Sequence, residues 1–305
     1  MARMSSVVVL GLAVTTACSS GPRPPPEPPA LCVLDRAGAS GASETVGPGT
    51  WVALLVRGYD PKTHRVTAPA LDCTGAQARW ESPALRCGDN VLARTALPER
   101  PLAEADVMTS DVGPGSTLVW IATTSYASGD ASGPVALALR SRSQLRVVAI
   151  GVLRAFPRNV KLRLESMGGV KVLVAEGDQC TAGDGSSCAR VARVVPLVGS
   201  RFEPMPLVGE DGQCVSPALF ELSRTERRHA REGWELAELS TALAFGPNGL
   251  AVQEQVLVHD LGESERGAAL RVLHRAQASR AVRWSVNRMM TSGAPLWSRM
   301  APASR

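Results

Sequence analysis

Cysteine is the residue type in this 305-residue chain whose chemistry is easiest to specify, and the chain contains seven. Six of them lie at positions 32 to 214, and these are Cys32, Cys73, Cys87, Cys180, Cys188 and Cys214. Their spacing lacks the Cys-x₂-Cys pairs and nearby histidines of a zinc site, so we expect no metal and no other cofactor. An even number of cysteines instead favours three disulfide bonds, provided that the protein folds in an oxidising compartment.

Local sequence suggests how these six cysteines pair, although six cysteines allow about 15 pairings. Cys180 and Cys188 flank a Gly/Asp/Ser segment between two apolar runs, so their disulfide would close a hairpin. Cys73 and Cys87 are also close in sequence and form the second expected pair. Elimination then pairs Cys32 with Cys214.

Sequence motifs for catalysis are missing. The chain has no G-x-S-x-G nucleophile motif, no P-loop and no H-E-x-x-H motif. The acidic cluster from Asp260 to Glu265 could supply a general acid and base, but a polar turn after a strand explains it more simply. Asp178, Asp184 and Asp211 could bind Ca²⁺, yet aspartates among glycines are typical of turns. We therefore expect no catalytic residues.

The charge of the chain is positive and dominated by arginine. The formal net charge is +5, and lysine occurs only at Lys62, Lys161 and Lys171. Aromatic residues make up only 4% of the chain, which is too few for the stacking platforms that bind single-stranded nucleic acid, so no nucleic-acid partner is expected.

Arginines are most concentrated near the C-terminus, where residues 266–305 contain no acidic residue. Four of these arginines are candidates for a face that binds an anionic partner, namely Arg271, Arg275, Arg280 and Arg283. The alternative, which we favour, is a set of solvated arginines on the outward face of the last strands. Val282 and Trp284 alternate with Arg283 there, and the arginines form no single helical stripe.

The N-terminus has the pattern of an export signal. Arg3 precedes the apolar segment Val7 to Val14, and the small residues Thr15, Thr16 and Ala17 complete a cleavage site. Residues 1–17 are therefore predicted to be a signal peptide. Export leads to an oxidising compartment, which agrees with the expected disulfides.

Cys18 directly follows this signal, and the arrangement resembles the lipobox of bacterial lipoproteins. The resemblance implies cleavage before Cys18 and attachment of lipid, including palmitate, to that residue. Thr15 stands where the family usually has Leu, and Thr15-x-Ala17 also suits ordinary signal-peptidase cleavage. Ser19 resembles the outer-membrane sorting signal of Gram-negative lipoproteins, which implies an outer-membrane lipoprotein with a periplasmic or surface-exposed domain.

A proline-rich segment follows Cys18. Proline fixes φ and removes a hydrogen-bond donor, so residues 18–30 are predicted to form an extended tether, about 25–30 Å long over Gly21 to Pro29. A proline-rich ligand for a partner domain is the alternative. The Ala/Arg/Gly/Pro-rich composition and the tether also resemble uncharacterised cysteine-containing lipoproteins of myxobacteria, which implies no activity and no functional residues.

The rest of the chain is predicted to be all-β, with one or two short helices. Val160, Leu162 and Leu164 alternate with charged residues, and Met167 to Gly169 has the length of a hairpin turn. Such patterns recur through residues 116–305, which predicts a main domain built as an antiparallel meander in a sandwich or barrel, stapled by disulfides.

Residues 31–115 are predicted to be a loop-rich N-terminal β subdomain. Strands are expected at Leu31 to Leu34 and at Trp51 to Arg57, and a short helix at Leu102 to Met108. Within the main domain, Arg224 to Glu232 carries charges of both signs and is expected to be an exposed helix or loop.

These features predict a non-catalytic lipoprotein of the cell envelope that displays a β-rich binding or assembly domain. Its expected partners are a membrane, reached through the lipid anchor, and envelope proteins or surface polysaccharide. The alternative is an envelope hydrolase of cell-wall or surface polymers, whose residues converge only in three dimensions.

Overall fold

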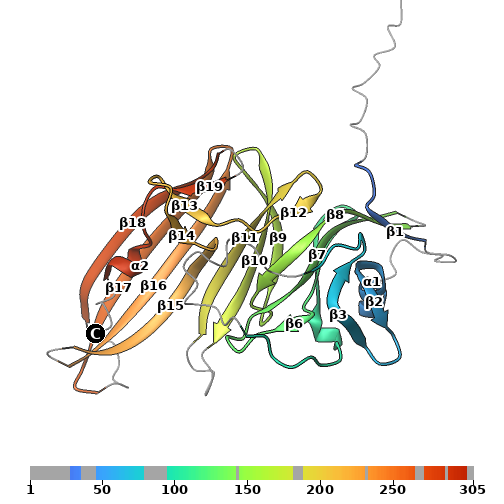
Figure 1. Cartoon of the computed structure of the whole chain (residues 1–305). Coiled ribbons are helices and arrows are strands. Elements are labelled where there is room, and N and C mark those ends of the chain that lie inside the picture. Colours follow the sequence, from blue (N-terminus) through green and yellow to red (C-terminus); the bar gives the residue numbers. More distant parts are fainter. Residues whose placement is uncertain are drawn as a thin grey trace, which may run out of the picture.

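The computed structural model describes residues 28–35, 46–78, 95–141, 144–180, 188–230, 233–264, 271–285 and 288–300. Strands dominate these residues, only two short α-helices occur among them, and the predicted all-β fold class is confirmed. Figure 1 shows an elongated molecule, with the N-terminal elements at one end and the long strands β15 to β18 at the other. Neither helix in the described part is long and apolar enough to cross a bilayer.

The N-terminal elements are β1 (Cys32–Asp35), α1 (Pro48–Leu55), β2 (Val56–Asp60) and β3 (Arg65–Asp72). The expected strand at Trp51 to Arg57 is wrong, because the chain is helical as far as Leu55. Pro48 lies at the first helical position, where its fixed φ suits a helix. The apolar residues of α1 fall on one helical stripe and are buried against the next strands; they are Trp51, Val52, Leu54 and Leu55.

The following strands are β4 (Val107–Gly113), β5 (Ser116–Ile121), β6 (Thr124–Ser125), β7 (Ala131–Arg140) and β8 (Gln144–Ala155). The predicted helix at Leu102 to Met108 is wrong: a single 3₁₀ turn at Glu104–Asp106 leads directly into β4. Strands β4, β5, β7 and β8 pair in that order, and β1 pairs with β8. Strand pairing therefore crosses the predicted subdomain boundary at residue 115.

Three central strands follow, β9 (Lys161–Met167), β10 (Val170–Cys180) and β11 (Cys188–Val198). They form antiparallel pairs, and the turn between β9 and β10 consists of Gly168 and Gly169, both with positive φ, as a two-residue hairpin turn requires. The short strand β12 (Arg201–Phe202) pairs with both β11 and β8. It therefore joins the central strands to the paired strands β1, β4, β5, β7 and β8, which we name the N-terminal layer.

The C-terminal elements are β13 (Leu207–Gly209), β14 (Cys214–Ser216), β15 (Leu219–Ala230), β16 (Gly233–Gly246), β17 (Gly249–Gly262), β18 (Arg271–Ser285), β19 (Arg288–Thr291) and α2 (Leu296–Met300). Strand β15 pairs with β11, and β16 to β19 then follow by antiparallel pairing. The predicted helix or loop at Arg224 to Glu232 is wrong, because residues up to Ala230 belong to β15. Arg224, Glu226 and Arg228 lie on one face of that strand, and Arg227 lies on the other.

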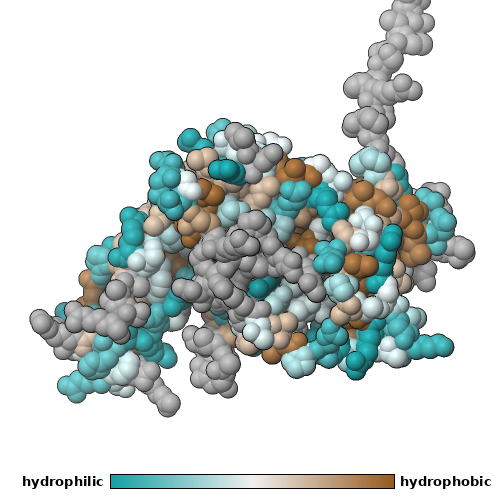
Figure 2. Space-filling model, in the orientation of Figure 1, coloured by the Kyte–Doolittle hydropathy of each residue, from teal (hydrophilic) through white to brown (hydrophobic). Residues whose placement is uncertain are grey.

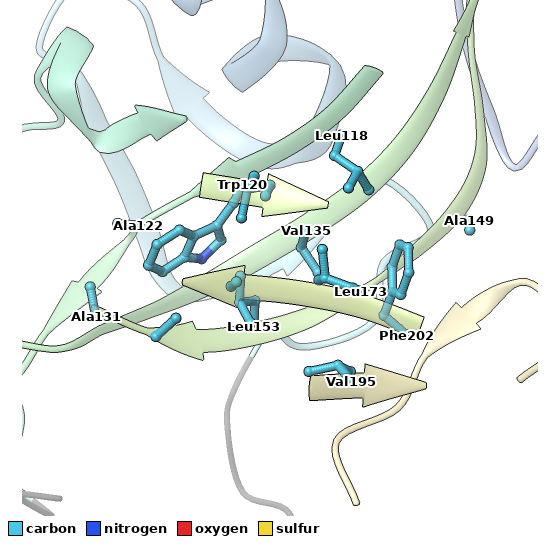
Figure 3. Packing of buried hydrophobic residues seen from close by; sticks show 13 residues of the cluster. Leu118, Trp120, Ala122, Ala131, Val135, Ala149, Leu153, Leu173, Val195 and Phe202 are labelled. Carbon is cyan, nitrogen blue, oxygen red and sulfur yellow. The ribbon is translucent and has the colours of Figure 1, made fainter. Parts of the chain in front are cut away.

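The central strands separate two hydrophobic cores. On one side, Leu173 packs with Trp120, Leu153 and Phe202 from the N-terminal layer and β12 (Figure 3). On the other side, Val172 and Val174 pack with side chains from β15 to β19. Strand layers are thus packed face to face and joined at β12, and the central strands have both faces buried.

Candidate functional site

The strands β15 to β18 extend beyond the body of the molecule and form what we name the projecting sheet (Figure 1). Strand β15 pairs with β11 only through Leu219 to Ser223, and β18 pairs with β19 only from Val282 onward. Outside these short contacts, the four strands pair only with one another among the described residues. In Figure 2 the visible surface over these strands is mostly hydrophilic or neutral.

One face of the projecting sheet is covered by α2. The helix packs Leu296 and Trp297 against Leu239 and Val256, which lie on neighbouring strands. The guanidinium of Arg224 lies 5.0 Å from the centre of the Trp297 ring, a cation–π contact at the margin of the helix. We name this side the helix-covered face.

A buried ion pair holds α2 to the helix-covered face. Arg280 Nη2 lies 3.3 Å from Glu254 Oε1, and both side chains are less than a tenth exposed. The backbone N–H of Leu296, at the start of α2, donates a hydrogen bond of 3.1 Å to Glu254 Oε2. Glu254 therefore connects β17, β18 and α2 through one carboxylate.

The opposite side of the projecting sheet, which we name the open face, is exposed. Side chains alternate along a strand, so the neighbours of the helix-facing residues point to this side. Most exposed positions there are small or uncharged, among them Ser240, Ala242, Ala244, Ala251, Gln253, Gln277 and Ser279, whereas Arg227, Arg275 and Arg283 are exposed and charged. A flat surface of this composition can contact another flat surface but encloses no small molecule.

The end of the open face that is remote from the contacts with β11 and β19 carries larger side chains. His229 and Trp234 make an edge-to-face contact with ring centres 5.3 Å apart. His259 Nε2 lies 3.1 Å from Glu238 Oε2, and no hydroxyl or thiol bonds to that imidazole in the described part of the chain. Val272 nearby is about half exposed. A histidine and carboxylate without a nucleophile are not a catalytic triad.

The structure does not bring the four predicted arginines together. Arg280 is buried on the helix-covered face, so its inclusion in an anionic-partner face was wrong. Arg275 and Arg283 point to the open face and are exposed. Arg271 is mostly exposed and lies 3.3 Å from Asp260 Oδ2. A charged face built from the remaining three stays an untested candidate, and solvated arginines on the outward face stay the favoured prediction.

The disulfides agree with the predicted pairing at one position only. Cys180 and Cys188 are bonded at the end of the β10–β11 hairpin, with Cα atoms 4.0 Å apart, which confirms that pair. Cys32 is bonded to Cys73, so the expected pairs of Cys73 with Cys87 and of Cys32 with Cys214 are wrong. Packing of β1 and β3 around α1 brings Cys32 and Cys73 together.

Two predicted cysteines lie outside the described residues. Cys214 on β14 is also disulfide-bonded, but its partner is not among the residues that the structure describes. Cys87 and the lipidation candidate Cys18 both fall in parts of the chain that are not described. Lipidation at Cys18 therefore stays a prediction.

A charged network lies on the central strands. It is on the same face as the core that they share with β15 to β19, farther along β10. Arg163 bonds Glu176, and Arg190 Nη1 donates to Asp178 Oδ1 at 2.8 Å. Partial burial opposes ionisation of Asp178, but hydrogen bonds from Arg190 and Asn159 outweigh it and lower the pKa of that carboxyl. Asp178 is therefore occupied by protein donors rather than available to Ca²⁺.

Two other acidic candidates, Asp211 and Asp260, act in turns. Asp211 Oδ1 accepts the backbone N–H of Gln213, and Asp260 Oδ1 accepts that of Gly262, as turn residues do. Glu263 is exposed, and Asp184 and Glu265 lie outside the described residues. No cluster of three or more metal-ligating side chains occurs in the described ranges.

A buried polar cluster between β7, β8 and β11 was not predicted. Arg154 forms an ion pair with Asp130 and stacks over the Tyr126 ring, 3.6 Å from its centre. Arg193 is completely buried and donates to the backbone oxygens of Arg154 and Pro217. Burial lowers the pKa of Arg193 to about 9, because charge is costly away from water. The hydrogen bond from Arg193 to Arg154 links β11 to β8 of the N-terminal layer. In the sequence, the only sign of this cluster is an arginine at a strand position where an apolar residue is expected.

An open depression of about 620 Å³ lies where the β9–β10 turn meets the β16–β17 turn. Its polar side chains are Glu165, Ser166 and Lys171, and Phe245 and Pro247 form part of the opposite wall. Glu165 is already paired with Arg163 at 2.6 Å. The depression thus offers one engaged carboxylate, one hydroxyl and one ammonium group, and its lining contains no histidine.

Comparison with known proteins provides no identification. No family model, curated protein or solved structure matches this chain. The projecting sheet presents an exposed face that is available to a partner.

Proposed function

We propose that this protein is a non-catalytic lipoprotein of the cell envelope, in which lipid on Cys18 anchors a β-rich binding or assembly domain to a membrane. The export signal, the cysteine that follows it and the proline-rich tether support the anchor. The outer membrane is the membrane proposed, and envelope proteins or surface polysaccharide are the proposed partners.

The position of the projecting sheet relative to the tether carries this proposal. The chain enters the domain at β1, where Leu31 N–H donates to Val147 O at 2.7 Å and Arg146 Nη2 donates to Pro28 O at 3.2 Å. Strand β1 lies at the end of the molecule remote from β15 to β18 (Figure 1). A tether attached there would hold the projecting sheet away from the membrane, in the position of a displayed surface.

Binding is favoured over hydrolysis by the composition of the available surfaces. Hydrolysis of a polymer by general acid and base needs two suitably placed groups, commonly a pair of carboxylates. The depression at the β9–β10 turn supplies one carboxylate, that of Glu165, beside Ser166 and Lys171, and Arg163 engages this carboxylate. The open face of the projecting sheet, by contrast, is broad and exposed in the manner of a contact surface.

The anchor can be tested with Cys18→Ser in the full chain, expressed in a Gram-negative host. We expect the variant to leave the membrane fraction and to lose labelling with a palmitate analogue, because no other residue would carry the lipid. Ser19→Ala retains Cys18 and serves as the matched control for labelling. A Cys18→Ser variant that stays in the membrane fraction and is labelled as before would contradict the proposal.

A further inference from the structure

Among the described residues, no strand pairs with the outer backbone edge of β18 between Arg275 and Ser279. Ser292 N–H donates to Ala281 O at 3.1 Å, and Ala281 N–H donates to Ser292 Oγ at 3.1 Å. The backbone groups of Ala281 therefore point away from β17. Direction alternates along a strand, so the backbone groups of Arg275, Gln277 and Ser279 point the same way. None of these three residues pairs with another strand in the described part of the chain.

This edge lacks most of the features that prevent edges from pairing. Natural edge strands are commonly protected by proline, lysine, a bulge or a covering segment. Residues Ala276 to Ser279 contain neither proline nor lysine, and their side chains are small or uncharged. The bulge in the β17–β18 pairing lies at Leu273, beyond the free segment, whose pairing with β17 is regular. Arg275 is the only charged residue in the segment.

We propose that two copies of this chain join through their β18 strands, which pair antiparallel about a two-fold axis at Gln277. Gln277 then faces Gln277 of the second copy, and Arg275 faces Ser279. Each such pair exchanges two backbone hydrogen bonds, and the two projecting sheets become one continuous sheet.

The register follows from the positions of the free groups. An axis at Ala276 would place Ser279 opposite the bulged Leu273. An axis at Ala278 would place Arg275 opposite Ala281, whose groups are already bonded to Ser292.

Axes at neighbouring outward residues fail on charge. An axis at Arg275 places that residue opposite its own copy, and an axis at Ser279 places Arg275 opposite Arg283. Like charges directly opposite one another destabilise a sheet. Only the axis at Gln277 places each of Arg275, Gln277 and Ser279, whose outward backbone groups are unpaired in the described part of the chain, opposite another residue of this set.

A second copy fits the edge better than an unrelated peptide because the segment is complementary to itself. In the proposed register Ala276 faces Ala278, so the helix-facing side presents small residues on both strands. The single charge, on Arg275, faces a serine hydroxyl. A two-fold interface requires such self-complementarity. The proposal does not depend on the lipid anchor, since the edge is present in the folded domain.

The register can be tested by cysteine cross-linking of the full chain. Facing residues of a hydrogen-bonded pair have Cα atoms about 5.5 Å apart, within disulfide range. Gln277→Cys is therefore expected to form a covalent dimer on mild oxidation. Ser279→Cys alone is expected to stay uncrosslinked, whereas a mixture of Ser279→Cys and Arg275→Cys chains is expected to link. Equal cross-linking of all single variants, or none for Gln277→Cys, would overturn the proposed register.

The pairing itself can be tested with Gln277→Pro. Proline removes an N–H that points away from β17, so the ladder to β17 keeps its hydrogen bonds while the outer edge loses its central donor. Analytical ultracentrifugation of the full chain in detergent is expected to show a dimer for the native chain and for Gln277→Ala. Gln277→Pro is expected to be a monomer with an unchanged circular dichroism spectrum. A native chain that remains monomeric at about 100 μM, or a dimeric Gln277→Pro, would refute the proposal.

Discussion

The central strands and the projecting sheet use β-structure in opposite ways. In β10 the consecutive residues Val172, Leu173, Val174 and Ala175 are all buried, because cores lie on both sides of the strand. In β17 buried residues alternate with more exposed ones, since only one side is covered. The central strands therefore stabilise the fold, while the projecting sheet keeps a face and an edge available for contact.

Buried and exposed arginines have different roles in this protein. Arg193 in the central region is fully buried and bonds backbone oxygens, while Arg283 in the projecting sheet is exposed. Burial of a charge is tolerated only where hydrogen bonds or an opposite charge compensate it. The role of an arginine in this protein is thus set by the face on which it lies, and matched substitutions can separate the two roles.

The largest loss of stability is expected when the buried ion pair of the projecting sheet, Arg280 with Glu254, is broken. Arg280→Ala should lower the free energy of unfolding by about 3–5 kcal/mol, because it leaves Glu254 buried without its partner. Arg283→Ala, three residues away and exposed, should change it by less than about 0.5 kcal/mol. Urea unfolding would measure both. Similar losses for the two variants would contradict the assigned faces.

Substituting one leucine in each region compares how much a side chain stabilises the central strands and the projecting sheet. Leu173→Ala should lower the free energy of unfolding by about 2–5 kcal/mol, because Leu173 is fully buried against the core around Trp120. Leu273→Ala should cost less than about 0.5 kcal/mol, since Leu273 is exposed at the bulge of β18. Thermal and urea unfolding would show the difference. A costly Leu273→Ala would mean that the far end of the projecting sheet is covered.

The hairpin disulfide should have a smaller effect than the core. Replacing both cysteines, Cys180→Ser with Cys188→Ser, should lower the free energy of unfolding by about 2–3 kcal/mol, as expected for a short loop. The ladder between β10 and β11 remains, so the variant should still fold. Unfolding of the variant beside the native chain would test this. A loss well above that of Leu173→Ala would show that the hairpin depends on its disulfide.

The smallest expected effect is a change in acid stability. The pKa of Asp178 is lowered in the folded state, so its stabilising contribution is present above the unfolded pKa of 3.8 and is lost as the pH falls through the folded pKa. Asp178→Asn removes this contribution and should flatten the dependence of stability on pH below about pH 4. Unfolding curves across that range would measure the slope. An unchanged slope would exclude Asp178 from acid unfolding.

Local patterns were predictable from the sequence, and non-local contacts were not. The alternation at Val160 to Glu165 and the glycine turn after Met167 correctly predicted the β9–β10 hairpin, and the Gly/Asp/Ser segment correctly predicted the Cys180–Cys188 bond. The pairing of Cys32 with Cys73 depends on how β1 and β3 pack around α1, which no local pattern shows.

Two errors have a physical cause that the structure makes clear. The apolar run from Trp51 has no strict alternation, and Pro48 at the first turn together with burial of one side of the run favours a helix. The charged segment from Arg224 was expected to leave the sheet, but cross-strand ion pairs such as Arg228 with Glu235 support it as a strand. Charge patterning alone therefore does not separate an exposed loop from an exposed strand.

The sequence by itself determined the all-β class, the hairpin turns and the one local disulfide, because each depends on backbone preferences and contacts within a few residues. Tertiary structure alone decided that Arg280 is buried beside Glu254, that β10 lies between two cores and that part of β18 has no outer partner strand in the described part of the chain. These properties depend on which strands pair far along the chain. Strand pairing is a cooperative result of burying many side chains at once, and it leaves no signature in any single segment.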